Sequence, residues 1–294
     1  MRLVLGTAQW GTGYGITNGL GRLSDWQIAA MMETALEAGI DAVDTHRSTR
    51  TSQGYGDAQV RLRPWAPRLD ITTKAFGSSS RGVSIPDQLA ASLNELGVDR
   101  LHACLIHDWA DLSPEEAARA GEGLNRARDL GMCEHIGVSA YVDEELLSAL
   151  DFIEGIDVAQ VPASPIDQRI CGGVGVRELR KRGAELHVRG LFAQGLLLPH
   201  NQITPFDTHP AIQRFSAFCR ENSLNPIQAC LSYGRSIAEA THIVIGASSP
   251  LQLEQVLEAW LSIPEVIDWS EFACDDLDLV DPRRWPSTDA PAAH

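Results

Sequence analysis

The sequence predicts an α/β fold, a single (β/α)8 TIM barrel with long loops after its second and seventh strands. Short apolar runs alternate with amphipathic segments along the 294-residue chain, and eight of these runs are expected to be strands. They are rich in Val, Ile and Leu and lack sustained polar alternation, which is typical of parallel strands buried on both faces. Eight strand–helix units in series favour a closed barrel.

The main alternative to a closed barrel is an open, doubly wound sheet. Such a sheet would call for a Gly-x-Gly-x-x-Gly turn that opens a helix directly after the first strand. Residues 6–15 (GTAQWGTGYG) are rich in glycine but have a different spacing, so they favour the barrel. The expected strands cover residues 2–8, 40–45, 69–75, 101–108, 134–140, 157–163, 185–192 and 241–247.

Helix start signals occur in the segments between the expected strands. Ser24 is the expected N-cap of the first long helix, and Ser113 precedes Pro114 at a first helical position. Ser249 and Pro250 begin the last helix in the same way. The expected helices cover residues 24–39, 85–97, 113–131, 142–155, 176–183 and 249–260.

Two long, irregular segments interrupt this alternation. Residues 46–59 are polar and follow the second strand, whereas residues 196–210 follow the seventh and contain Pro199, Pro205 and Pro210. In a barrel both segments lie at the carboxyl ends of the strands, where loops build the active site. We therefore expect these loops to exclude water from the site and to set its specificity.

The composition narrows the class of protein. A net charge of -15 argues against a nucleic-acid partner, for which a basic patch would be expected. The six cysteines are scattered and form no Cys-x-x-Cys pair, so we expect no disulfide framework. No apolar run approaches the roughly 18 residues of a membrane span, and the N-terminal run is too short for a signal peptide. We expect a cytoplasmic protein without a membrane partner.

We expect one domain over residues 1–294, with the barrel core at about 2–262 and a partly irregular C-terminal extension over 263–294. The acidic stretch from Asp276 to Asp281 is expected to be solvated. Residues 281–294 are rich in Pro and Ala, and we expect them to be poorly ordered. The sequence is compatible with a homo-oligomer but does not specify one.

Four polar residues follow successive strands and can handle a proton together. Asp44, Lys74 and His107 end the second, third and fourth strands, and Tyr55 lies in the loop after the second. An ammonium beside a phenol lowers the phenol pKa from about 10, so Lys74 is expected to activate Tyr55. Taken singly, each residue has an ordinary explanation as a cap or a solvated side chain. Because no side chain donates hydride, a redox reaction would require a cofactor.

The chain resembles the aldo-keto reductase family from about residue 2 to residue 260. The segments that carry the resemblance are LGTAQWG, IDAVDT followed by YGDAQ, ITTKAF, LIHDW, HIGVSAY, VAQVPASPIDQR, VRGLFAQGLLL and VIGASSPLQLEQVL. They occur in the family's order, one strand after another. The resemblance implies a (β/α)8 barrel that transfers hydride reversibly between a nicotinamide dinucleotide and a small-molecule carbonyl.

The resemblance also implies a role for each candidate residue. Tyr55 would be the general acid, Lys74 and Asp44 would tune it, and His107 would orient the substrate. Arg189 falls where many members carry a tyrosine stacked on the nicotinamide. The candidate cofactor-binding residues are Ser139, Gln160, Arg189, Gly190, Leu191, Phe192, Gln194, Gly195, Leu196, Gly246, Ser248, Gln252 and Gln255, and the candidate substrate-pocket residues are Trp10, His46 and Trp109.

Several positions depart from the family pattern. Asp44 and Tyr55 are 55 − 44 = 11 positions apart, farther than in most members, which leaves open whether Tyr55 reaches the hydride site or His46 replaces it. Ala58-Gln59 and Ala140 also replace the usual residues. NADP(H) is expected over NAD(H) from the family alone, since residues 247–249 offer no cation for a 2′-phosphate. The polar loop after the second strand favours a hydroxylated or anionic substrate, such as a sugar-like carbonyl compound.

Two other interpretations remain open at this point. A metal-dependent hydrolase on the same barrel would use Asp44, His46, His107, Asp108 and His187 as nitrogen and oxygen ligands. A barrel that binds the dinucleotide without turnover, as a sensor or subunit, would explain the insertion before Tyr55. The resemblance to the family implies no metal.

Overall fold

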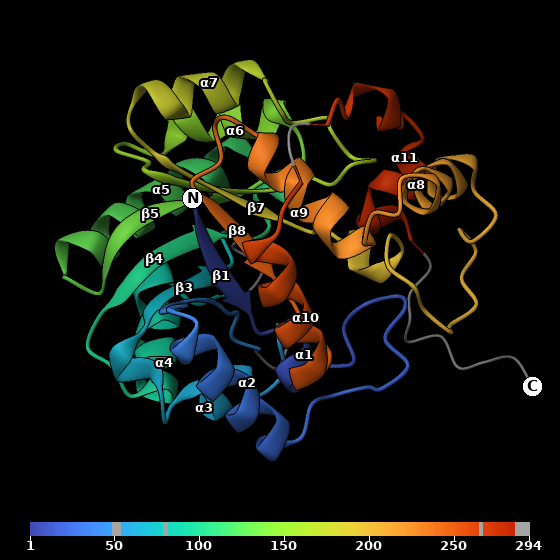
Figure 1. Ribbon diagram of the computed structural model, residues 1–294. Coiled ribbons are helices and arrows are strands. Elements are labelled where there is room, and N and C mark those ends of the chain that lie inside the picture. Colours follow the sequence, from blue (N-terminus) through green and yellow to red (C-terminus); the bar gives the residue numbers. More distant parts are fainter. Residues whose placement is uncertain (49–53, 79–81, 265–266, 286–294) are drawn as a thin grey trace, which may run out of the picture.

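The computed structural model describes residues 1–48, 54–78, 82–264 and 267–285. Eight parallel strands close into a barrel in the order β1 to β8, with β1 paired to both β2 and β8 (Figure 1). The predicted (β/α)8 barrel is therefore confirmed. The strands are β1 (Arg2–Gly6), β2 (Ala42–Asp44), β3 (Asp70–Ala75), β4 (Leu101–Ile106), β5 (Cys133–Ser139), β6 (Val158–Pro162), β7 (Glu185–Arg189) and β8 (His242–Ile245).

Most of the observed strands end earlier than the sequence pattern predicts. The last residues of these predicted strands leave the sheet and enter the loops that form one end of the barrel. At β7, for example, Gly190 adopts a left-handed conformation with φ 72°, which glycine tolerates without a Cβ penalty. The chain therefore turns directly after Arg189 and does not extend to residue 192.

The helices surround the barrel and bury one face each against it (Figure 1). Ser24 and Ser113 form the predicted N-caps, each within a capping box, and the Ser249 hydroxyl accepts a hydrogen bond from Gln252 N. The helices are α1 (Ala8–Gly11), α2 (Asp25–Glu37), α3 (Ala58–Leu62), α4 (Ile85–Leu96), α5 (Pro114–Asp129), α6 (Asp143–Phe152), α7 (Val174–Lys181), α8 (Pro210–Glu221), α9 (Pro226–Ser236), α10 (Pro250–Leu261) and α11 (Leu277–Val280).

Two long helices after β7, α8 and α9, are absent from the sequence-based prediction. Both begin with the start signal that other helices of this chain carry, an N-cap residue followed directly by a proline. The N-cap residues here are His209 and Asn225. The signal was therefore present in the sequence. Within the described residues, no helix is long and apolar enough to cross a lipid bilayer.

The C-terminal extension packs back on the barrel, contrary to part of the prediction. Asp281 is buried and accepts hydrogen bonds from Arg283, and it lies 3.9 Å from the Arg169 guanidinium. Trp285 is half-buried, and its indole N–H donates to the Leu279 carbonyl. The prediction of a solvated acidic stretch holds for Asp276 but is wrong for Asp281, whose partner lies more than a hundred residues away. Residues 286–294, expected to be poorly ordered, lie outside the described residues.

Candidate active site

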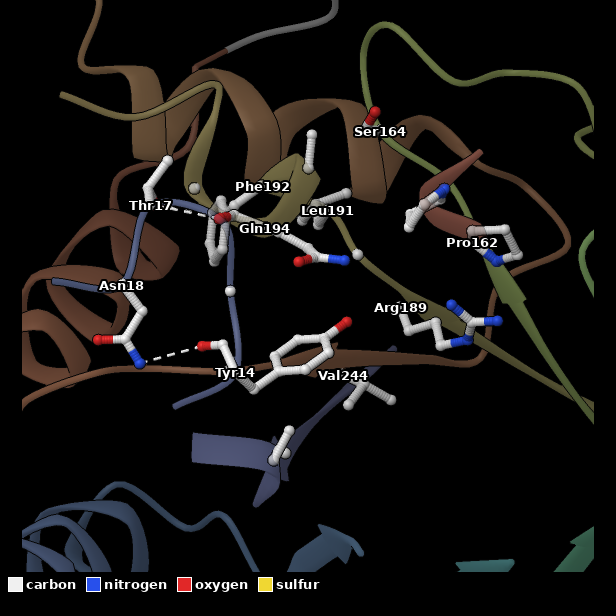
Figure 2. A pocket seen from close by; sticks show the side chains of 18 of the residues that line it. Tyr14, Thr17, Asn18, Pro162, Ser164, Arg189, Leu191, Phe192, Gln194 and Val244 are labelled. Atoms are coloured by element: carbon white, nitrogen blue, oxygen red, sulfur yellow. Dashed lines mark hydrogen bonds between the residues drawn. The ribbon is translucent and has the colours of Figure 1, made fainter. Parts of the chain in front are cut away.

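A deep cleft opens at the carboxyl ends of the strands and encloses about 1180 Å³, part of it open solvent (Figure 2). Its walls come from the loops after β1, β6, β7 and β8 and from the C-terminal extension. Segments that are far apart in the sequence therefore share one cleft.

A buried ion pair lies at the base of this cleft. Lys74 Nζ is 2.7 and 2.6 Å from the two carboxylate oxygens of Asp44, and their side chains are only 1% and 3% exposed. The Gln160 amide donates a third hydrogen bond to Asp44 at 2.8 Å. Burial lowers the pKa of Lys74, and Asp44 opposes that shift. The pair comes together because Asp44 ends β2 and Lys74 lies near the end of the adjacent strand β3.

Tyr55 lies beside this ion pair in spite of the insertion. Lys74 Nζ is 5.2 Å from the centre of the Tyr55 ring, and Tyr55 lines the cleft. The Tyr55 amide donates to the His46 carbonyl at 3.0 Å, so Tyr55 lies close to the end of β2. The extra length therefore does not move Tyr55 away from Asp44.

Close backbone contacts fix the position of Tyr55. A Cβ on Gly11 would clash with the Tyr55 carbonyl, and a Cβ on Gly56 would clash with the Gly11 carbonyl. Gly56 also has φ 57°, a conformation that favours glycine. The two glycines thus let α1 press against the returning loop. Residues 49–53 of the polar segment, which favoured an anionic or hydroxylated ligand, lie outside the described residues.

Two histidines form an aromatic cluster with Tyr55. His46 stacks on His107 with ring centres 4.6 Å apart, and it meets Tyr55 edge-on at 5.7 Å. Phe76 packs against both imidazoles. His46 and His107 therefore both lie near the phenol, as the sequence pattern predicted for strand-end residues.

The phenol pKa shifts in the direction opposite to the sequence-based expectation. Burial raises the pKa of Tyr55, the Asp44 carboxylate raises it further, and Arg189 lowers it. The expected lowering is wrong, because burial of the phenol is the largest influence on its pKa. A phenol in this setting keeps its proton near neutrality, which is the form that a general acid needs.

Two tryptophans predicted to line the substrate pocket do not do so. Trp10, a residue of α1, is fully buried, and the buried Trp109 packs against Phe152. Neither is among the residues that line the cleft. Their large apolar side chains serve packing, which removes water-exposed area from the core.

The candidate residues for the nicotinamide end differ in their surroundings. Ser139 lies at the end of β5 and Gln160 in the middle of β6; both are buried and outside the lining of the cleft, and Gln160 Oε1 has no hydrogen-bond partner among the described residues. An unpaired buried acceptor is costly. Arg189 lines the cleft and stacks on the Tyr141 ring at 4.3 Å.

The loop after β7 forms a tight turn at the cleft. Ala193, Gln194 and Gly195 have successive positive φ values of 47°, 52° and 97°, and the amides of Ala193 and Gly195 donate to the Gly190 and Phe192 carbonyls within the turn. Thr17 pins the loop by donating to the Gln194 carbonyl at 3.0 Å. Figure 2 shows Phe192 and Gln194 beside this contact.

Most of the candidate cofactor residues line the cleft, but four do not. Ser139, Gln160 and Leu196 are buried, and Gln255 is exposed on α10 away from the cleft. Gln252 lies in the first turn of α10 and reaches the cleft, whereas Gln255 lies nearly one turn farther along the helix. The candidate residues that line the cleft are Arg189, Gly190, Leu191, Phe192, Gln194, Gly195, Gly246, Ser248 and Gln252.

The sequence analysis missed several lining residues. Tyr14 projects into the cleft with its hydroxyl toward Gln194 (Figure 2), and Asn18 Nδ2 donates to the Tyr14 carbonyl. Tyr14 lies in the glycine-rich segment after β1, and Asn18 follows that segment. An aromatic residue soon after a barrel strand was the signal that could have indicated Tyr14. Ser164, Asp167 and Trp285 come from the loop after β6 and the C-terminal extension, and only the folded chain brings them to the cleft.

The fold and the site define a barrel protein whose polar side chains gather at the carboxyl ends of its strands, next to a cleft that is lined by loops from several strands. The Aldo/keto reductase family model matches residues 2–273, and the chain belongs to this family. The family consists of oxidoreductases that act on small-molecule carbonyl compounds with nicotinamide cofactors, generally NADP(H).

Relatives and solved structures agree with this membership. An aldo-keto reductase of Mycolicibacterium paratuberculosis is 28% identical over 269 residues, covering 90% of this chain and 79% of the relative. One from Mycolicibacterium vanbaalenii is 32% identical over 128 residues, 44% of this chain and 46% of its own length. The crystal structure of a putative aldo-keto reductase from Pseudomonas aeruginosa superposes with a TM-score of 0.66 at 19% identity, covering 89% of this chain and 90% of that one. At this identity the solved structure shows the shared fold.

Proposed function

We propose that this protein is an NADP(H)-dependent reductase of aldehydes or ketones in which Tyr55 is the general acid. The observation that carries the proposal is the position of the Tyr55 phenol, next to the buried Lys74–Asp44 pair and on the wall of the cleft. The bound nicotinamide would supply the hydride that attacks the carbonyl carbon. Tyr55 would donate its proton to the carbonyl oxygen.

The side chains around Tyr55 support this assignment in different ways. Lys74, held by both oxygens of Asp44, keeps positive charge beside the oxygen that becomes a phenolate. His107 and His46 would hold the carbonyl in line by hydrogen bonding from the stacked imidazoles. Because the insertion returns Tyr55 to the strand end, it no longer argues for a barrel without turnover.

The metal-hydrolase interpretation loses its ligand set. His187, which it requires, contacts Glu185 and His242 at the opposite ends of the strands. Asp44 is engaged by Lys74 and Gln160. We therefore retain carbonyl reduction as the single proposal.

The cofactor would lie across the cleft from β6 to β8. Ser139 and the unpaired oxygen of Gln160 would face the nicotinamide amide. The turned backbone at Gln194 and the amides at the start of α10 would hold the pyrophosphate, since a helix N-terminus attracts anions. The preference for NADP(H) rests on the family, because no lysine or arginine occurs at residues 246–252.

The proposal is tested by titrating the purified protein with NADPH and with NADH, followed by a screen of carbonyl substrates. We expect saturable binding, tighter for NADPH, and oxidation of the bound cofactor by at least one aldehyde or ketone. Tight binding without oxidation by any carbonyl across a broad panel would instead favour a non-catalytic barrel. Failure to bind either dinucleotide would overturn the assignment altogether.

Arg189 would favour substrates that carry a negative charge. Its guanidinium lines the cleft, and no carboxylate of the described residues lies within 4 Å of it. The nearby carboxylates have other partners, because Asp44 pairs with Lys74 and Asp167 pairs with Arg169. A partly buried cation without an acidic partner attracts an anion. We therefore expect a carbonyl compound with a carboxylate or a similar anionic group.

Replacing Arg189 with Met should raise KM for a 2-oxo acid or an aldehyde acid about tenfold or more, which corresponds to the loss of one charge-assisted hydrogen bond. A neutral carbonyl compound of similar size should change much less. Steady-state kinetics on the two substrates measures the difference. Equal losses for both substrates, together with weaker NADPH binding, would assign Arg189 to the cofactor.

A further inference from the structure

A second cluster of carboxylate and imidazole side chains lies toward the amino ends of the strands. The proposed reaction uses no residue of this cluster. Glu185 and His187 of β7 and His242 of β8 offer ligand atoms that lie within 4.8 Å of one another. His102, near the start of β4, adds a fourth group, because its Nε2 is 3.2 Å from Glu185 Oε2. These residues come from strands across the barrel and share one carboxylate.

The spacing of these atoms suits a small cation. Glu185 Oε2 is 2.8 Å from His187 Nε2, 3.2 Å from His102 Nε2 and 3.8 Å from His242 Nδ1. Tetrahedral zinc holds nitrogen and oxygen ligands at about 2.0–2.2 Å, which places neighbouring ligands about 3.3–3.6 Å apart. The ligand atoms of Glu185, His187 and His242 lie within 4.8 Å of one another, so these three side chains need only small movements to surround one ion.

One buried nitrogen of the cluster is not satisfied by the protein. His187 is only 2% exposed, and its Nδ1 has no hydrogen-bond partner among the described residues. The Nδ1 of His242 contacts the Thr241 hydroxyl at 2.9 Å, a bond that competes with a metal. An ion could enter from solvent, because the Glu185 side chain is 26% exposed.

We propose that Glu185, His187 and His242, with His102 as the fourth ligand, form a site for a divalent transition metal such as zinc. Imidazole and carboxylate ligands suit zinc, nickel and copper more than magnesium or calcium. The ion would tie β4, β7 and β8 together at the end of the barrel opposite the cleft. The role is structural, because the site lies away from the proposed active site.

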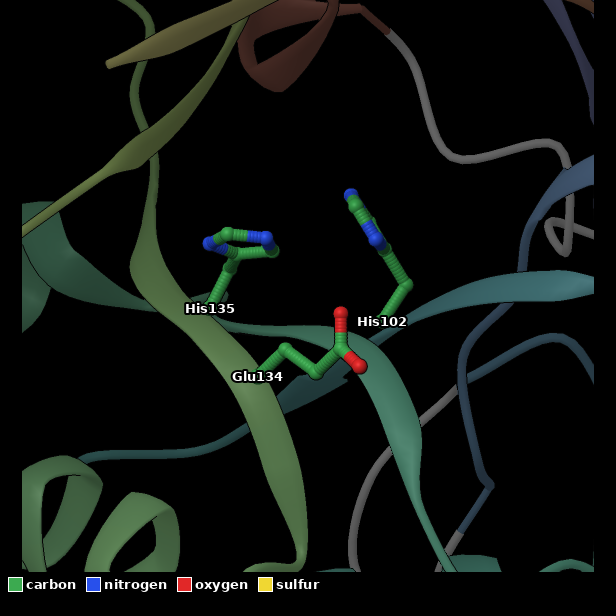
Figure 3. Close-up of side chains that lie close together, drawn as sticks. All are labelled: His102, Glu134 and His135. Atoms are coloured by element: carbon green, nitrogen blue, oxygen red, sulfur yellow. The ribbon is translucent and has the colours of Figure 1, made fainter. Parts of the chain in front are cut away.

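A neighbouring triad supplies a matched comparison. His102 projects from β4 beside Glu134 and His135 of β5 (Figure 3), and these three also offer ligand atoms within 4.8 Å. Glu134 is exposed and pairs with Arg100, and His135 is bonded to Asp157 at 2.9 Å. These competing partners and greater exposure make it the weaker site. We expect it to contribute little to metal affinity.

The test uses the full-length chain with its purification tag removed. Isothermal titration with ZnCl2, and the visible spectrum of the Co2+-loaded protein, should show about one tightly bound equivalent in tetrahedral geometry. The conservative variants Glu185→Gln and His187→Gln should each bind zinc at least about 100-fold more weakly. Zinc should also raise the Tm of the wild-type chain but not of these variants. Circular dichroism checks that each variant is folded, and His242→Gln replaces any that is not.

Control variants show which cluster holds the ion. His135→Gln changes the neighbouring triad, and His209→Gln changes a histidine that pairs with the exposed Asp276. Both variants should bind zinc like the wild type. Asp44→Asn should also leave zinc binding unchanged, which separates this site from a metal at the catalytic end. The proposal is overturned if the wild type binds no zinc, because the cluster is then a hydrogen-bonded network. It is equally overturned if binding is lost in His135→Gln or Asp44→Asn but kept in His187→Gln.

Discussion

Replacing Tyr55 with Phe should lower kcat by about 10²- to 10⁴-fold, the usual contribution of a positioned general acid. The change removes only the hydroxyl, so the ring keeps its contacts with His46 and with the Lys74 ammonium. We therefore expect the affinity for NADPH and the Tm to stay close to those of the wild type. Stopped-flow measurement of NADPH oxidation by an accepted carbonyl compound, with cofactor titration alongside, measures both quantities.

Tyr14→Phe is the matched control, because Tyr14 lines the same cleft (Figure 2), whereas the contact with the Lys74 ammonium is made by Tyr55. It should change kcat by far less than Tyr55→Phe. Full turnover in Tyr55→Phe would remove this phenol from the mechanism. In that case His107→Gln and His46→Gln should be compared, since either stacked imidazole is placed to donate a proton.

The barrel was predictable because its signals are local. Each strand reads as a short run without polar alternation, and helices such as α5 carry Ser-Pro and a capping box within a few residues. Asp44, Lys74 and His107 were predictable for the same reason, since a polar side chain directly after a buried strand faces the carboxyl end of a barrel. These predictions needed no knowledge of distant contacts.

The features that the sequence did not reveal depend on contacts between distant segments. The return of Tyr55 to His46 depends on the close approach of Gly11 to the loop, and the spacing alone suggested displacement instead. The burial of Asp281 depends on Arg169. The direction of the Tyr55 pKa shift depends first on burial of the phenol and then on the nearby Asp44, and burial depends on packing between distant segments.

Breaking the Lys74–Asp44 pair from either side should abolish most turnover and destabilise the fold. Lys74→Met leaves a carboxylate that is 3% exposed with only Gln160 as a side-chain donor. Loss of one partner from a buried ion pair costs about 3–5 kcal/mol. Urea unfolding at fixed pH should show this loss, and Asp44→Asn should show a smaller one, because a buried lysine can lose its proton.

The pH dependence of unfolding distinguishes the two variants. Burial lowers the pKa of Lys74 below 10.5 in the folded chain, and Asp44→Asn removes the charge that opposes this shift. The unfolded chain then binds more protons between the two pKa values, so the stability of Asp44→Asn should rise with pH through that window. In Lys74→Met the buried carboxylate is relieved by taking up a proton, so its deficit should shrink as the pH falls.

The double variant Lys74→Met/Asp44→Asn completes the cycle. It contains no uncompensated buried charge, so it should recover most of the stability lost in Lys74→Met, as neutral replacements of buried ion pairs often do. Its turnover should nevertheless stay low, because the phenol of Tyr55 has lost the cation that stabilises its deprotonated form. Recovery of turnover along with stability would mean that the pair only supports the fold, and that proton transfer from Tyr55 does not need Lys74.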